Sequence, residues 1–322
     1  MKIAFVGKGG SGKTTLSSLV ARHLAGRGRT VLALDADINQ HLGVALGLDE
    51  SAAAAIPALG DHLEEIKEHL RGENPRIPAA REMVKTTPPG TGSRLLAVAG
   101  PSPLHDRLSV EVGGVRLMVT GAFTEEDLGV ACYHSKVGAV ELLLNHLVDG
   151  PGEYVVVDMT AGADSFASGL FTRFDRTFLV AEPTRKGVAV YEQYRGYAAD
   201  HDIPISVIGN KIHDDRDLAF LRDRVGDDLL VHLGQSAAVR AMEQGQPAGS
   251  VALEPANTAA LDRICAAVDD TARDWDRLHR QMIEFHVKNA RSWANNTVGI
   301  DLTRQIDPGF RLDLQVGITV TA

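Results

Sequence analysis

The sequence predicts an α/β protein whose central sheet is mostly parallel and flanked by helices. Apolar runs of strand length alternate with segments of helical period, which is the pattern of βαβ units. Several runs are continuous in Val, Ile and Leu, as expected for strands that helices cover on both faces. A glycine-rich turn at residues 7–12 separates the first run from the first helical segment. These observations favour a ligand site at the carboxyl ends of the strands.

The expected elements alternate along most of the chain. The expected strands are Lys2–Val6, Thr30–Leu34, Leu95–Ala99, Val115–Val119, Tyr154–Asp158, Thr177–Ala181, Pro204–Gly209 and Leu229–Leu233. The expected helices are Lys13–Gly26, Lys136–Leu147, Gly187–Asp200, Asp215–Val225 and Ser236–Gln244. A helix between two strands lets them lie parallel, so this alternation predicts parallel pairing.

We expect one α/β domain over residues 1–272 and a C-terminal helical extension over residues 273–322. Residues Gly60–Ser93 interrupt the alternation, because a charged helix, Asp61–Arg71, is followed by turn sequences rich in Pro and Gly. Such an excursion is uncommon in a compact domain unless it is functional. We therefore predict an inserted flap that contacts a partner or substrate and can be deleted without loss of folding.

Composition excludes several classes of protein. The chain of 322 residues is 44% hydrophobic and 23% charged, so it is neither disordered nor fibrous. Its formal net charge of −9 argues against nucleic-acid binding, which needs Lys and Arg to neutralise phosphates. No run approaches the ~18 apolar residues of a membrane helix, and the N-terminus lacks a signal-peptide pattern. We expect a cytoplasmic protein without stable membrane insertion.

The segment at residues 7–15 has the spacing of a phosphate-binding loop, in full Gly7-Lys8-Gly9-Gly10-Ser11-Gly12-Lys13-Thr14-Thr15. Glycines let backbone N–H groups converge on phosphate oxygens at the start of a helix. Lys13 is expected to reach the β- and γ-phosphates, and Thr14 to ligate Mg²⁺. The alternative is a purely structural glycine turn, which leaves Lys13 and Thr14 at this spacing unexplained.

Lys8 makes the loop more specific. A lysine at this place resembles the deviant Walker A motif of the SIMIBI-class P-loop ATPases, a group with the MinD and ParA positioning ATPases, the nitrogenase iron protein and the CooC-like nickel-insertion ATPases. The resemblance covers most of residues 1–272 and implies a P-loop NTPase fold. It also implies a homodimer that forms with ATP, in which Lys8 reaches the nucleotide of the partner subunit. The alternative for Lys8 is a solvated surface charge.

Two further segments resemble motifs of the same group. Asp35-Ala36-Asp37 resembles switch I, in which the second carboxylate, here Asp37, positions the attacking water. Residues 155–162 resemble Walker B and switch II, so Asp158 is expected to hold Mg²⁺ through water and the Gly162 backbone to sense the γ-phosphate. Independently, a carboxylate at the end of a central parallel strand lies where such sheets bind ligands. The alternative is that each Asp is a helix cap or turn residue.

Asn210 and Lys211 follow another expected strand and resemble the adenine contact of the group. A guanine-specific NKxD motif would need a carboxylate at position 213, where this chain has His213. Guanine selectivity rests on a carboxylate that accepts hydrogen bonds from the base. ATP is therefore favoured over GTP as the nucleotide.

Cys132 and His134 are candidate ligands of a transition metal. The motifs of the chain are similar to those of CooC-like proteins, which carry Cys-x-Cys at this place and join two subunits around a metal; here the second position is His. Two Cys and two His from a dimer make a tetrahedral set for Zn²⁺, whereas Ni²⁺ is the ion that the resemblance implies. The alternative is a buried thiol beside a surface histidine. Ser165 stands where an iron–sulfur cluster would need its second cysteine.

Three classes of function stay open for an ATPase of this kind. The first is a metallocentre-maturation or metallochaperone role that couples slow ATP hydrolysis to an unknown client protein. The second is a MinD- or ParA-like positioning ATPase, which would need a membrane-binding helix or a basic DNA surface. The third is a nucleotide-gated protein adaptor. Stoichiometric metal at Cys132 would favour the first class.

Overall fold

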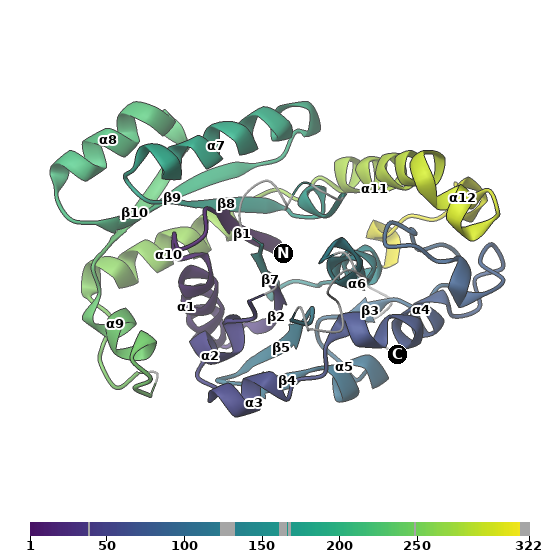
Figure 1. Cartoon of the computed structure of the whole chain (residues 1–322), viewed down its shortest axis with the longest axis horizontal. Helices are drawn as coiled ribbons and strands as arrows, with labels where there is room; N and C mark the ends of the chain where they lie inside the picture. The colour runs from purple at the N-terminus through teal and green to yellow at the C-terminus, as the bar shows by residue number, and fades with distance from the viewer. Residues whose placement is uncertain (38, 123–132, 161–165, 167–168, 248, 316–322) are drawn as a thin grey trace.

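An eight-stranded sheet forms the centre of the molecule (Figure 1). The structure is a computed structural model, and it describes residues 1–322 apart from 38, 123–132, 161–165, 167–168, 248 and 316–322. The strand order is β10-β9-β8-β1-β7-β2-β5-β4. Neighbouring strands are parallel, except that β4 and β5 are antiparallel. The predicted mostly parallel sheet is confirmed.

Apart from the antiparallel β4, the strands of this sheet end at the edge where the candidate site lies. The strands of the sheet are β1 (Lys2–Gly7), β2 (Thr30–Ala36), β4 (Val110–Val112), β5 (Val115–Val119), β7 (Glu153–Met159), β8 (Arg176–Ala181), β9 (Ile205–Ile212) and β10 (Leu229–Gly234). Two short strands, β3 (Leu96–Ala97) and β6 (Leu147–Val148), form a separate parallel pair. The prediction of a longer strand at Leu95–Ala99 was therefore wrong.

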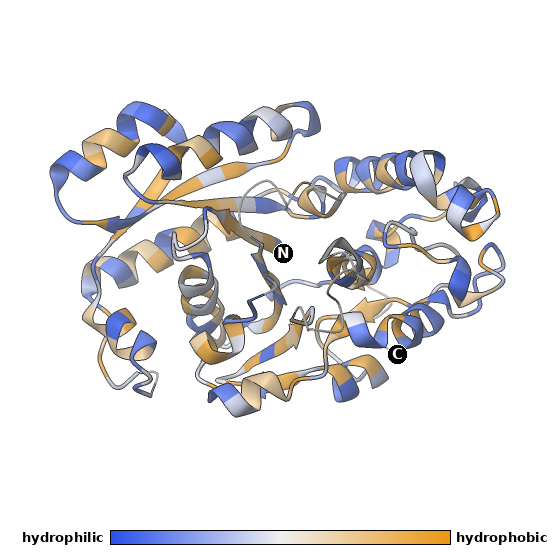
Figure 2. Cartoon of the chain, in the orientation of Figure 1, coloured by the Kyte–Doolittle hydropathy of each residue, from blue (hydrophilic) through white to orange (hydrophobic). Residues whose placement is uncertain are grey.

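Helices cover both faces of the sheet. They are α1 (Lys13–Gly26), α2 (Leu42–Leu46), α3 (Glu50–Ala54), α4 (Leu63–Arg71), α5 (Pro103–Leu108), α6 (Tyr133–His146), α7 (Arg185–Ala198), α8 (Asp215–Val225), α9 (Ala237–Glu243), α10 (Pro255–Asp269), α11 (Trp275–Asn289) and α12 (Asn295–Val298), and a π-helical turn at Ala290–Ala294 joins the last two. Figure 2 shows orange, hydrophobic strands between helices of mixed colour. The long helices that cover the sheet, such as α1, α7 and α10, therefore have an apolar face for the sheet and a polar face for solvent.

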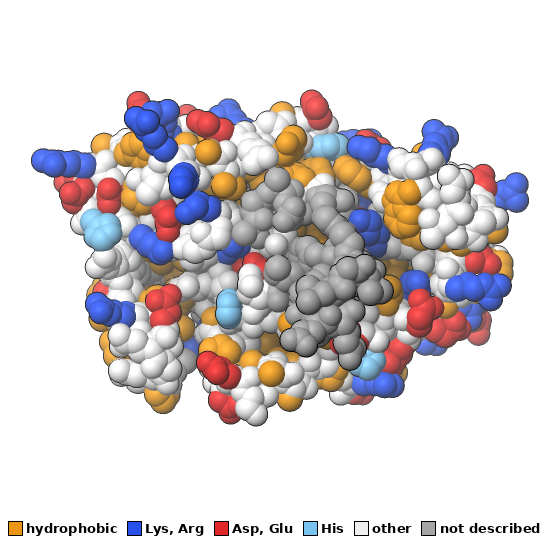
Figure 3. Space-filling view, in the orientation of Figure 1, with side chains coloured by type: hydrophobic (Ala, Val, Ile, Leu, Met, Phe, Trp, Pro, Cys, Tyr) orange, Lys and Arg blue, Asp and Glu red, His pale blue; other side chains and the backbone are white. Residues whose placement is uncertain are grey.

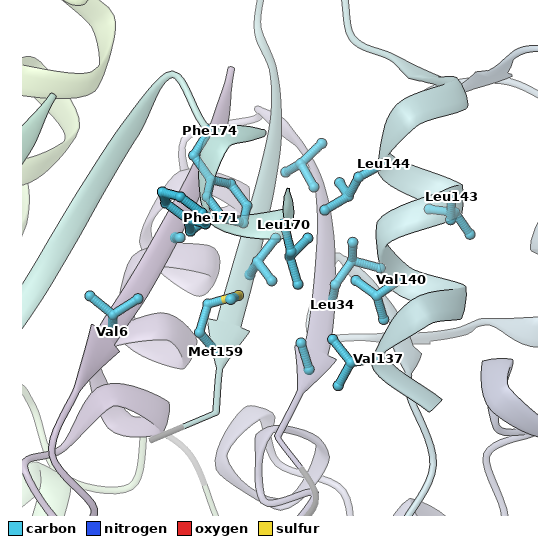
Figure 4. Close-up of a cluster of buried hydrophobic side chains, with 14 of the residues drawn as sticks. Val6, Leu34, Val137, Val140, Leu143, Leu144, Met159, Leu170, Phe171 and Phe174 are labelled. Atoms are coloured by element: carbon cyan, nitrogen blue, oxygen red, sulfur yellow. The ribbon is translucent and has the colours of Figure 1, made fainter. Parts of the chain in front are cut away.

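Alternation along the strands builds two hydrophobic cores. Successive side chains of a strand point to opposite faces, so Val6 lies in the core with α4, α6 and α7, whereas Phe5 lies in the core with α1 and α10. Figure 4 shows Val137 and Val140 of α6 beside Leu34 of β2 in the first core. The continuous apolar runs of the sequence thus serve both faces at once.

The segment Gly60–Ser93 is part of the protein core. Ile66, Leu70, Ile77 and Met83 belong to the large core cluster, with exposures of 1% or less, and Val84 belongs to a smaller cluster with residues of the C-terminal extension. Turn sequences rich in Pro and Gly resemble a linker, but here they carry apolar side chains into the interior. The prediction of a flap that lies outside the core was therefore wrong.

Residues after 272 pack on the same body. Phe285 of α11 contacts Phe171 edge-on, with ring centroids 5.6 Å apart. The Arg273 guanidinium lies 4.7 Å from the centroid of the Trp275 ring. Trp293, in the π-helical turn, is 43% exposed. The extension thus has one tryptophan against the body and one at the surface.

Candidate functional site

The loop between β1 and α1 has the backbone of an anion cradle. Gly10 and Gly12 have φ values of +79° and +96°, in the left-handed region that favours glycine. Gly12 is the N-cap of α1 and supplies no capping side chain, and the first turn of α1 has no acidic residue. The amide groups of this turn therefore stay available, and the positive end of the helix dipole favours an anion there.

A cavity of about 1280 Å³ opens above this loop. Figure 3 shows the surface indented between α9 and α3, and Figure 1 places α9 opposite α1 and α2. The predicted site residues that line it are Gly9, Gly10, Gly12, Lys13, Thr14, Thr15, Asp37, Asn210 and Lys211. The structure thus brings together residues from the ends of β1, β2 and β9, and the volume suits a nucleoside triphosphate.

Asp158 meets the first turn of α1. The Thr14 hydroxyl donates to Asp158 Oδ2 at 2.6 Å, and the Ser17 hydroxyl donates to Oδ1 at 3.2 Å. Burial raises the pKa of the Asp158 carboxyl to about 7, although the hydrogen bond from Thr14 lowers it. A hydroxyl and a carboxylate beside phosphate-binding amides are the oxygen donors that Mg²⁺ prefers, so these residues fit the ion. Sequence reasoning missed Ser17, whose only signal is its place three residues after Thr14 on one helix face.

Asp37 is held at the rim of the cavity by its own loop. Its Oδ1 accepts from the backbone N–H of Asn39 at 3.1 Å and from Asn39 Nδ2 at 3.0 Å. The buried Asp35 carboxylate accepts from the backbone of Asp37 at 3.2 Å and of Leu42 at 2.9 Å. Burial raises the pKa of Asp35 well above its ordinary value, and its cross-strand neighbour Asp158 adds to the rise. Asp35, which the sequence did not single out as a site residue, therefore shapes the loop that carries Asp37.

Asn210 and Lys211 are bound to the phosphate loop. Asn210 Nδ2 donates to the Ser11 carbonyl at 2.7 Å, and a Cβ added to Gly12 would lie 2.2 Å from the same nitrogen. Lys211 Nζ donates to the Gly10 carbonyl at 2.6 Å and pairs with Glu182 at 2.7 Å. Both residues line the cavity, but their side-chain nitrogens face the loop.

The remaining predicted residues lie apart from this cluster or outside the description. Lys8 does not line the cavity; its carbonyl accepts from the Ser11 amide at 3.1 Å. Gly162 and Cys132 fall outside the described residues, and so does the side chain of His134, whose backbone belongs to α6. Among the residues that are described, no group of three or more His, Cys, Asp or Glu side chains is arranged to hold a metal ion. The transition-metal site therefore stays a prediction.

In the described part of the chain, no helix is both long and apolar enough to span a bilayer. The described cysteine, Cys265, is buried in α10, and burial raises the pKa of its thiol to about 11. A thiol with so high a pKa is a packing group.

Comparison with known proteins supports the nucleotide site. A family model described as the CobQ/CobB/MinD/ParA nucleotide binding domain matches residues 3–248. The carbon monoxide dehydrogenase accessory protein CooC of Rhodospirillum rubrum is 29% identical over 246 residues, which are 76% of this chain and 87% of CooC. An uncharacterized ATP-binding protein of Methanocaldococcus jannaschii is 29% identical over 231 residues, 71% of this chain and 81% of that protein.

Solved structures with the same fold include the septum site-determining protein MinD of Pyrococcus horikoshii in complex with Mg-ADP. The two chains superpose with a TM-score of 0.55 at 18% identity, and the match covers 84% of this chain and 96% of the other. At this level of identity the likeness establishes the fold alone.

Proposed function

The chain belongs to the CobQ/CobB/MinD/ParA nucleotide-binding family, and from this premise we propose that it is a Mg²⁺-dependent ATPase that dimerises with ATP and acts on a protein client. One observation carries the proposal. The 2.6 Å contact between Thr14 and Asp158 joins the start of α1 to the end of β7 beside the phosphate-binding amides. That contact puts a hydroxyl and a carboxylate where the cation of a bound Mg-ATP would lie.

Positioning and charge neutralisation account for the proposed hydrolysis. The loop amides and Lys13 bind the phosphates, and Lys8 is proposed to reach the nucleotide of the partner subunit. Thr14 and Asp158 would hold Mg²⁺, and the ion would supply positive charge against the developing charge of the phosphate oxygens. Asp37, fixed by Asn39, is proposed to orient the attacking water. Because this site would be complete only in the dimer, hydrolysis is expected from the dimer and not from the monomer.

We propose that the client is a metalloenzyme or its metal-delivery partner. The support is the 29% identity with a carbon monoxide dehydrogenase accessory protein over 76% of this chain. Cys132 and His134 remain the proposed ligands of a Zn²⁺ or Ni²⁺ ion shared across the dimer axis. The MinD-like alternative is supported by the family model, which includes MinD and ParA, and by the common fold.

The test follows the mass of the protein and its metal content together. Light scattering should find dimers with Mg-ATP and monomers with Mg-ADP, and Asp37→Ala should accumulate as a dimer, because nucleotide contacts survive while water is no longer oriented. Elemental analysis should find about one transition-metal ion per two chains, lost in Cys132→Ser. A protein that stays monomeric with Mg-ATP and releases no phosphate would refute the ATPase. A metal-free protein that still dimerises would move the function to the adaptor class.

A further inference from the structure

Two consecutive residues of β9 contact the same loop, which a regular strand does not allow. Side chains at successive strand positions point to opposite faces of the sheet. Asn210 and Lys211 nevertheless bind the carbonyls of Ser11 and Gly10, which are also consecutive. Because both side chains point toward the phosphate loop, the backbone of β9 must depart from regular strand geometry at these residues.

A β-bulge provides that change. The pairing of β9 with β10 shifts register so that Asn210 and Lys211 together lie opposite Leu233 alone. Lys211 has a φ of +59°, in the left-handed region that a non-glycine residue enters at a cost. Bulges turn side chains in new directions and are common next to active sites. Here the bulge directs both side chains at the phosphate loop.

The contacts fix two peptide planes of the loop. In a trans peptide the carbonyl and the following N–H point in opposite directions. Holding the Ser11 carbonyl against Asn210 therefore turns the Gly12 N–H away from β9. Holding the Gly10 carbonyl against Lys211 likewise fixes the Ser11 N–H, which donates to the Lys8 carbonyl at 3.1 Å. Contacts within the protein itself therefore hold these two peptide planes.

Glu182, at the end of the strand between β9 and β1, orients the Lys211 side chain. The order β9-β8-β1 places the end of β8 between Lys211 and the phosphate loop. Glu182 follows β8 directly, is 18% exposed, and accepts from Lys211 Nζ at 2.7 Å. The carboxylate lets the lysine take one of its three donors to the Gly10 carbonyl and another to Glu182.

We propose that Asn210, Lys211 and Glu182 are positioning residues that hold the phosphate loop preorganised for any triphosphate, whatever its base. This inference rests on the proposed nucleotide binding and goes beyond the adenine contact expected for Asn210 and Lys211. Preorganisation raises affinity because the loop loses less freedom on binding. The contribution is therefore to phosphate affinity and is equal for ATP, GTP and inorganic tripolyphosphate.

Calorimetry with Mg-ATP, Mg-GTP and Mg-tripolyphosphate tests the inference. Lys211→Met should weaken all three by a similar factor, about tenfold, and Lys211→Arg should restore most of the affinity. Lys186→Met, an exposed lysine of α7 that does not line the cavity, removes the same charge and is the matched control. If Lys211→Met weakened Mg-ATP but spared tripolyphosphate, Lys211 would be a base contact and the inference would be wrong.

Glu182→Gln separates positioning from simple charge. Removing a carboxylate near the loop makes it more positive, so charge alone predicts tighter triphosphate binding. If Glu182 acts by positioning Lys211, Glu182→Gln should weaken triphosphate binding by about threefold. Adding Glu182→Gln to Lys211→Met should then cause no further loss of affinity. Tighter binding by Glu182→Gln would overturn the inference. A wild-type protein that bound none of the three ligands would instead refute the proposed function.

Discussion

Asp158 has two properties that oppose each other in the nucleotide-free protein. It is fully buried, and the carboxylate must be ionised for the proposed binding of Mg²⁺. Burial raises its pKa from the ordinary 3.8 to about 7. Between these values the native state holds a proton that the unfolded chain has lost, so stability is complete below the ordinary pKa and falls as pH rises through about 7.

We predict that the free energy of unfolding of the nucleotide-free protein falls from about pH 4 to about pH 7 and then levels off, with a contribution from Asp158 on the order of 4 kcal/mol. Asp158→Asn should flatten this fall, and Asp35 should leave a residual slope in the same direction. Urea unfolding at several pH values measures it. The exposed carboxylate variant Asp223→Asn, on α8, is the control and should keep the wild-type slope. An unchanged slope in Asp158→Asn would contradict the assignment.

Substitution of the two lysines of the phosphate loop should have different effects on nucleotide binding and on dimerisation. Lys13, 5% exposed, lines the cavity, so Lys13→Ala should lower Mg-ATP affinity more than a hundredfold, or about 3 kcal/mol. Lys8 does not line it, so Lys8→Ala should keep affinity within about threefold and lose dimerisation and turnover. Calorimetry and light scattering on the same samples measure both effects. Equal loss of affinity in both variants would show that Lys8 acts within its own subunit.

At the level of single residues, motif spacing predicted residues that the structure brings to one cavity. Lys13, Thr14 and Asp37 line one cavity, and Asp158 meets Thr14 as expected. The supporting groups were not predictable, because Asp35 acts through backbone N–H groups that only the folded loop brings to it. The direction of the Lys211 side chain depends on a bulge, which hydrophobic patterning does not reveal.

Among the elements, α4 shows how a charged helix can also serve the core. Ile66 is fully buried under α6, while Glu68 of the same helix is exposed and pairs with Arg71. We predict that Ile66→Ala lowers the free energy of unfolding by about 2–4 kcal/mol, because it leaves a cavity. Glu68→Ala, the control on the same helix, should change it by less than about 0.5 kcal/mol. Chemical denaturation measures the free energy of unfolding of both variants. Equal small effects would mean that residues 60–93 are a flap outside the core after all.

Periodicity predicted the long elements well and the irregular ones poorly. The helices α1 and α8 begin and end at the predicted residues, because strong patterns and flanking glycines mark them. Short helices such as α2 and α5 were missed, since five or six residues hold too little of a helical period. The prediction of a flap outside the core was wrong because turn residues do not exclude burial, and Ile77 and Met83 among them are apolar and buried.

For the whole molecule, we propose that the ATPase domain ends near residue 272 and that Arg273 attaches the extension to it. Arg273 binds the Asp175 carboxylate through Nε at 2.9 Å and Nη2 at 2.7 Å, and Nη2 also binds Asp149. The side chains of Asp149 and Asp175 are 1% and 0% exposed, so the guanidinium offsets charge that water cannot reach.

Arg273→Met should therefore lower the free energy of unfolding by about 3–5 kcal/mol, because it leaves two buried carboxylates without this partner. Arg280→Met, on α11, removes an exposed arginine that lies 3.9 Å from Asp202, and should cost less than about 0.5 kcal/mol. Thermal melting of both variants measures the difference. Similar melting temperatures would mean that the extension is attached by its apolar contacts alone.

The placement of the tryptophans gives the extension its own optical signal. The chain has two, Trp275 and Trp293, and both follow residue 272. Trp275 lies against a guanidinium and Trp293 is partly in water, so their emission maxima should differ. Fluorescence excited beyond the tyrosine absorption therefore comes from the extension alone. A Trp→Phe change at one position leaves the other tryptophan as the single fluorophore. Its emission with and without nucleotide would show whether binding at the candidate site changes the surroundings of that tryptophan.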